Sequence, residues 1–253
     1  MKIGRTIPPA AAPVSARDLL RGVSGLFGGR FLGTIENEIG EYFGAESVFL
    51  SSSGKAALVL ILRGLSSLQP RKKVLIPAYT CYSVASAVVH EGLEIALCDV
   101  DPDTLDFDYA QLERLADSDT LCIVSTHLFG IPSDVDRTRA ICRRNGIFLV
   151  EDAAQAMGME TGGRLLGTAG DVGFFSLGRG KSITCGSGGI ILAFSREIGE
   201  SIRERHRESG KERAGEYLRS IAEAFFMKIF LDPSLYWFPK GLPFLGIGET
   251  KFD

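Results

Sequence analysis

The sequence holds little of what a metal site or a nucleic-acid partner requires. Only three histidines occur among its 253 residues and none lies near a pair of cysteines, which argues against a zinc site. The five cysteines show no CxxC spacing and their number is odd, so we expect free thiols in a reducing compartment, the cytoplasm. The net charge is −3, whereas a nucleic-acid-binding protein needs a basic face.

Long apolar runs are also missing. No stretch is long enough to cross a bilayer, so we expect no transmembrane segment. Asp99, Asp101 and Asp103 alternate like the start of a calcium loop, but Ala110 stands where that loop needs Glu. The run GRGKS lacks the first glycine of a P-loop, since Phe175 occupies its place. No GxGxxG motif opens a helix after the first strand, which disfavours a nicotinamide enzyme.

What the chain does contain is a regular alternation of strand-like and helix-like segments from 48 to 154. This alternation predicts a mostly parallel sheet covered by helices on both faces. The segments FLVEDAA, DVGFFSL and GGIILAF bring the number of strands to seven, and the last two are close enough in sequence to pair antiparallel. Before the sheet we expect one helix over 16–28, capped by Ser15, and a second helix that opens at Thr34.

Two polar side chains end or follow buried strands of this sheet. Lys181 lies in a Gly- and Ser-rich loop between two apolar strands, where a cofactor could reach it, although a surface lysine on a hairpin loop would look the same. Asp152 follows the apolar run FLVE. It is either a helix N-cap or a carboxylate at the carboxyl end of a strand, where open α/β sheets bind ligands.

Together these segments resemble the DegT/DnrJ/EryC1/StrS family of sugar aminotransferases. Asp152 and Gln155 match the family's DAAQA segment, and Ser176 precedes Lys181 by the expected five residues. The resemblance implies a three-layer α/β/α fold, the pyridoxal-phosphate transferase fold type I, with a seven-stranded mixed sheet. It also implies that Lys181 binds pyridoxal 5'-phosphate covalently, that Asp152 keeps the ring nitrogen protonated and that Gln155 reaches the ring hydroxyl.

The phosphate of this cofactor would lie at the strand-to-helix turn SSSGKAAL. Backbone N–H groups and the helix dipole make such a turn an anion site. Gly54, Lys55 and Ala56 stand where the family usually has Gly-Thr-Ala, so a cation replaces a hydroxyl and either pairs with the phosphate or points to solvent. Ser176 is the second phosphate ligand that the resemblance implies.

An aromatic ring usually stacks on the cofactor after the PAYT strand end. The family's aromatic position falls on Cys81, and we expect Tyr82 to take the role; as an alternative, Tyr82 is an ordinary core residue. His127, at another strand end, is expected to be a buried, hydrogen-bonded residue and not a catalytic one.

The resemblance implies transfer of an amino group, with glutamate as the expected donor, to a nucleotide-linked keto-sugar by a homodimer. We expect an N-terminal arm and short helix over 1–30, a cofactor-binding large domain over 31–208, and an apolar segment over 209–253. Because the family's C-terminal small domain and its Asn/Arg loop are not found there, we expect a fragment. The alternative is a cofactor-binding or oligomer-forming protein without turnover. A third reading is the family's sugar dehydratase branch, which has His at this position, so Lys181 argues against it.

Overall fold

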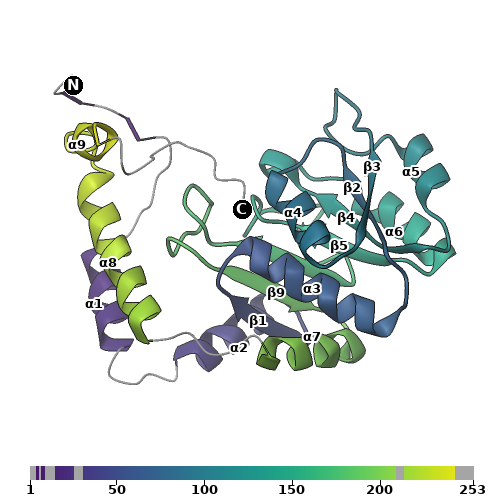
Figure 1. Cartoon of the computed structure of the whole chain (residues 1–253), viewed down its shortest axis with the longest axis horizontal. Coiled ribbons are helices and arrows are strands. Elements are labelled where there is room, and N and C mark those ends of the chain that lie inside the picture. Colours follow the sequence, from purple (N-terminus) through teal and green to yellow (C-terminus); the bar gives the residue numbers. More distant parts are fainter. Residues whose placement is uncertain (1–3, 6, 9–14, 26–30, 209–213, 243–253) are drawn as a thin grey trace.

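The computed structural model describes residues 4–5, 7–8, 15–25, 31–208 and 214–242. A seven-stranded sheet lies at its centre (Figure 1). Four of the six strand pairs are parallel, and β9 runs antiparallel to both of its neighbours. This arrangement confirms the predicted mixed, mostly parallel sheet. In spatial order the strands are β1 (Ser47–Ser51), β9 (Gly189–Ala193), β8 (Val172–Ser176), β5 (Phe148–Asp152), β4 (Thr120–Thr126), β2 (Lys73–Pro77) and β3 (Glu94–Cys98).

Alternate residues of the central strands face opposite helical layers, which is why these strands are apolar along almost their whole length. In β2, Val74 and Ile76 pack with the helices of one face and Leu75 with those of the other. The first face carries α3 (Gly54–Leu68), α4 (Tyr82–His90) and α7 (Arg196–Glu208). The second carries α5 (Tyr109–Leu115) and α6 (Val135–Asn145). The sheet therefore lies between two helical layers.

Some sequence predictions need correction. The second helix, α2 (Phe31–Phe43), begins three residues before Thr34, because Leu32, Ile35 and Ile39 already follow helical spacing. The small hairpin formed by β6 (Glu160–Thr161) and β7 (Arg164–Leu165) was not predicted, since two-residue strands carry no periodic signal. The first helix, α1 (Ala16–Gly25), matches its prediction, whose remaining residues 26–28 lie outside the described part.

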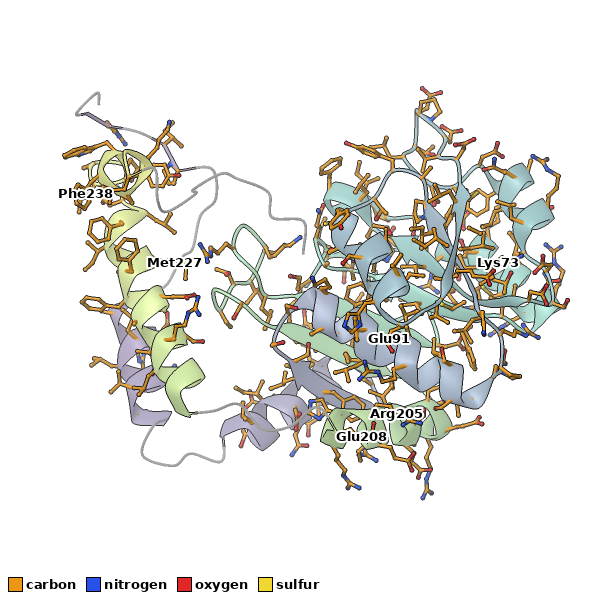
Figure 2. All side chains as sticks on the ribbon, viewed as in Figure 1. Lys73, Glu91, Arg205, Glu208, Met227 and Phe238 are labelled. Atoms are coloured by element: carbon orange, nitrogen blue, oxygen red, sulfur yellow. The ribbon has the colours of Figure 1, made fainter. Side chains whose placement is uncertain are left out.

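Two helices lie beside each other at some distance from the sheet. The C-terminal helix α8 (Ala214–Phe230) contacts α1, and the short helix α9 (Trp237–Lys240) follows it (Figure 1). Met227 of α8 is buried and faces the loop between β8 and β9 (Figure 2): a Cβ on Gly186 of that loop would come within 2.8 Å of the Met227 Cε. α8 therefore contacts the loop that contains Lys181. The predicted division of the chain at residues 30 and 208 stays a prediction.

Within the described ranges, no helix combines the length and the apolar character that a membrane span requires.

Candidate active site

A pocket of about 160 Å³ opens at the carboxyl ends of β4, β5 and β8, beside the first turns of α3 and α4. Parallel strands place their carboxyl ends at one edge of the sheet, so residues far apart in the sequence meet there. The pocket brings together six of the eight residues singled out from the sequence, namely Gly54, Lys55, Asp152, Gln155, Ser176 and Lys181.

The first turn of α3 forms one end of the pocket. Ser53 caps the helix, and its hydroxyl accepts a hydrogen bond of 3.0 Å from the Ala56 N–H. Ala56 thus gives its backbone donor to the cap and does not line the pocket. At position 54 a Cβ would lie only 2.9 Å from the Cβ of Ser176, so glycine is what lets the helix start approach the end of β8. A helix N-terminus and a serine hydroxyl side by side are suited to an anion.

Asp152 lies at the centre of the strand edge, between its neighbours on β4 and β8. Its side chain does not cap a helix, because residues 153–159 form turns, so the N-cap interpretation is wrong. The carboxylate is buried and accepts a 3.0 Å hydrogen bond from the Ala154 N–H. Burial raises the pKa of Asp152, while the Ala154 hydrogen bond and the charge of Lys181 oppose that rise. A cation bound beside this carboxylate would favour its ionised form.

Gln155 presents a defined donor to the pocket. Gln155 lines the pocket, and its Oε1 accepts a 2.6 Å hydrogen bond from the Phe129 N–H, so its amide N–H groups are the ones left for a bound molecule. An N–H donor is the group that a ring hydroxyl or phenolate oxygen needs, so the predicted role of Gln155 is chemically available.

The turn before α4 differs from what the sequence suggests. Tyr82, the first residue of α4, is 51% exposed and does not line the pocket, whereas Thr80 and Cys81 do. The proposed stacking by Tyr82 stays a prediction, with Cys81 nearer to the cavity.

His127 belongs to a buried polar network that the sequence indicated only in part. Its Nε2 lies 3.0 Å from Glu151 Oε2, and its Nδ1 accepts a hydrogen bond from the Ser133 N–H. Both partners of the His127–Glu151 pair are fully buried. Because Nδ1 accepts this hydrogen bond it carries no hydrogen, and Nε2–H donates to the Glu151 carboxylate. The neighbouring acidic pair Glu151-Asp152 in a buried strand was the available signal, and only Asp152 was assigned a role from it.

Two further residues of the pocket carry no sequence signal at all. Thr80 and Thr126 line the cavity, and their buried hydroxyl oxygens find no hydrogen-bond partner among the described residues. Buried polar groups in folded proteins almost always have a partner. Together with the anion-suited helix start and the buried carboxylate, these hydroxyls fit a polar, phosphorylated, cationic ring compound such as pyridoxal 5'-phosphate.

Comparison with known proteins decides the family. The model of the DegT/DnrJ/EryC1/StrS aminotransferase family matches residues 15–229. The chain belongs to this family. The assignment and the α/β fold predicted from the sequence are therefore confirmed.

Several curated relatives are similar to this family member. GDP-perosamine synthase of Caulobacter vibrioides is 33% identical over 175 residues, which cover 69% of this chain and 47% of the relative. L-glutamine:2-deoxy-scyllo-inosose aminotransferase of Streptoalloteichus tenebrarius is 35% identical over 170 residues, 67% of this chain and 40% of the relative. The chain spans about half the length of the curated relatives it matches.

Solved structures share the fold. Sugar aminotransferase CalS13 from Micromonospora echinospora superposes with a TM-score of 0.74 at 31% identity, over 83% of this chain and 59% of that one. The GDP-4-keto-6-deoxy-D-mannose-3-dehydratase of E. coli was solved with bound hydrated pyridoxal phosphate. It has a TM-score of 0.70 at 22% identity, over 78% of this chain and 53% of that one. Pyridoxal phosphate is thus confirmed as a cofactor of structures that share this fold.

Proposed function

We propose that this protein is a pyridoxal-phosphate-dependent aminotransferase that moves an amino group from an amino acid, with glutamate as the expected donor, to a nucleotide-linked keto-sugar. The observation that carries the proposal is the single pocket in which Lys181, Asp152 and the first turn of α3 meet. The names of the relatives, which include a GDP-sugar synthase and a UDP-sugar aminotransferase, support a nucleotide-sugar substrate.

Each residue of the pocket has a separate task in this proposal. Lys181 would hold the cofactor covalently through Nζ and carry a proton between carbon atoms of the reactants. The buried Asp152 carboxylate would hold a proton on the ring nitrogen. Bound pyridoxal phosphate supplies an electron sink for the reaction. Gln155 would donate an amide N–H to the ring hydroxyl.

The phosphate would bind at the start of α3 and at Ser176. The glycine at position 54 lets the start of α3 lie close to Ser176, and Lys55 lines the same pocket. Helix dipole, backbone N–H groups and a nearby ammonium all favour an anion, so the departure from the family's Gly-Thr-Ala keeps the site suited to phosphate.

A homodimer in the cytoplasm completes the proposal. Apolar residues of α8, namely Leu218, Phe225, Phe226 and Ile229, are exposed, and a partner subunit would cover them. The five cysteines are all free thiols, which suits a reducing compartment.

The decisive experiment asks which lysine holds the cofactor, because two lysines line the pocket. The purified protein is loaded with pyridoxal phosphate, reduced with borohydride and mapped by mass spectrometry. We expect the label on Lys181 and a visible absorbance band that Lys181→Ala abolishes. Lys55→Ala is the matched control and should keep the band while weakening affinity. A label on Lys55, or a band that survives in Lys181→Ala, would reject the assignment.

Turnover is tested on the same loaded protein. Addition of glutamate, and of glutamine in parallel, should bleach the visible band as the amino group reaches the cofactor. A protein that binds the cofactor but responds to neither donor would be a binding protein without turnover.

A further inference from the structure

Thr80 and Thr126 are the feature of the pocket that the proposed function leaves unexplained. Thr126 is the last residue of β4, and Thr80 lies in the turn that follows the neighbouring strand β2. Both hydroxyl oxygens are buried and lack a partner among the described residues, and both residues line the pocket. A hydroxyl withdrawn from water without a partner is unfavourable, so each lacks one hydrogen bond that a bound molecule could supply.

The strand register defines where Thr126 lies relative to Asp152. The two residues are direct partners in the parallel pairing of β4 and β5, so their side chains project side by side from the same face of the sheet. The Asp152 Oδ1 atom is already engaged by the Ala154 N–H, and no hydrogen bond joins Thr126 to the carboxylate. The Thr126 hydroxyl is therefore next to the carboxylate but available to a third group.

The strand order also separates Thr126 from the phosphate end. β5 lies between β8 and β4. Asp152 pairs with Thr126 on β4 and with Phe174 on β8, and Ser176 follows Phe174 by two residues at the end of β8. Ser176 is the residue that closely approaches Gly54 at the start of α3. A molecule that places its phosphate there and its ring nitrogen at Asp152 would bring its ring, not its phosphate, toward Thr126.

We propose that Thr80 and Thr126 form a hydroxyl pair that hydrogen-bonds the ring end of bound pyridoxal phosphate and thereby strengthens its binding. The proposal rests on the proposed function, because it assumes that this cofactor occupies the pocket. The two threonines are positioning residues: they orient the ring beside Asp152 and take no proton in the reaction.

The test compares protein with and without cofactor. In Thr80→Val and Thr126→Val a methyl group replaces a hydroxyl of similar size. Without cofactor the thermal midpoint should stay equal or rise, because an unsatisfied polar group has been removed. Affinity for pyridoxal phosphate, read from the absorbance titration, should fall about three- to tenfold per variant, as expected for one net hydrogen bond. A purely structural role would lower the midpoint in both states.

Three probes, namely pyridoxal phosphate, pyridoxal and inorganic phosphate, assign the contact to one end of the cofactor. Pyridoxal, which lacks the phosphate, should lose affinity in both variants as pyridoxal phosphate does. Inorganic phosphate should stabilise the variants as much as the wild type. Thr126→Ser, which restores the hydroxyl, should recover most of the affinity. Ser66→Ala is the matched control, because Ser66 also has a buried hydroxyl without a partner but lies on α3 outside the pocket, and it should bind all three probes like the wild type.

The outcomes separate this inference from the proposed function. Wild-type affinity in both valine variants would overturn the inference while leaving the aminotransferase proposal intact. If inorganic phosphate no longer stabilised the valine variants, the assignment of the contact to the ring end would be overturned. A wild-type protein that binds no pyridoxal phosphate would overturn the proposed function and the inference with it.

Discussion

Glu151→Gln is the substitution whose effect the structure defines most closely. The buried Glu151 carboxylate receives four hydrogen bonds. Oε1 accepts the N–H groups of Ala169 and Gly170, while Oε2 accepts the Gly167 N–H at 3.1 Å and the His127 Nε2–H at 3.0 Å. The same carboxylate therefore holds the loop before β8 and orients the imidazole in the pocket wall.

Glutamine cannot reproduce this arrangement. Its side chain has one oxygen, and its amide nitrogen would face two N–H donors whichever way the amide is turned. Two hydrogen bonds to a charged acceptor are lost, each worth about 1.5–3 kcal/mol, so we expect the free energy of unfolding to fall by about 3–6 kcal/mol. A loss of this size is a large part of the total stability of an ordinary domain.

Urea unfolding followed by circular dichroism measures the effect, with the midpoint and slope fitted for each variant. Glu113→Gln is the matched control: its carboxylate forms a 3.1 Å ion pair with Arg144, but its side chain is 49% exposed. Such a pair contributes about 0–1 kcal/mol, so that variant should resemble the wild type. If Glu151→Gln unfolds at the same urea concentration as Glu113→Gln, the four-bond network does not hold this loop.

The remaining predictions concern the carboxylate of the pocket and the assembly. Burial raises the pKa of Asp152 in the folded state, so at a pH above this raised pKa the ionised carboxylate lowers the stability of the folded protein. Asp152→Asn should therefore stabilise the cofactor-free protein at pH 7. This gain should vanish as the pH falls toward 3.8, the ordinary pKa of Asp, because the carboxyl is then protonated in both states. The same variant should slow the glutamate half-reaction by about two to four decades, as loss of one partner of a buried ion pair implies; equal rates would remove Asp152 from the mechanism. Light scattering at micromolar concentration should give the mass of a dimer, and a monomer would contradict the proposed assembly.

Local chemistry explains why much of this protein was predictable from its sequence. The apolar strands, buried on both faces, needed almost continuous Val, Ile, Leu and Phe, and that composition identified all seven strands of the sheet. The SSSGKAAL turn and the Gly-rich loop around Lys181 are likewise short-range features. Both were assigned correctly as turns at strand ends, because glycine and serine determine backbone geometry within a few residues.

Only the tertiary structure decided which side chains meet and which are satisfied. From the sequence, Asp152 could be either a helix cap or a carboxylate at a strand end. The structure excludes the cap, because β5 is followed by turns and not by a helix. The Glu151 network joins residues 16 to 24 positions apart, and the Thr126 position depends on the order β8-β5-β4 across the sheet. Strand order and hydrogen-bond satisfaction are properties of contacts between distant segments, and no periodic pattern along the chain encodes them.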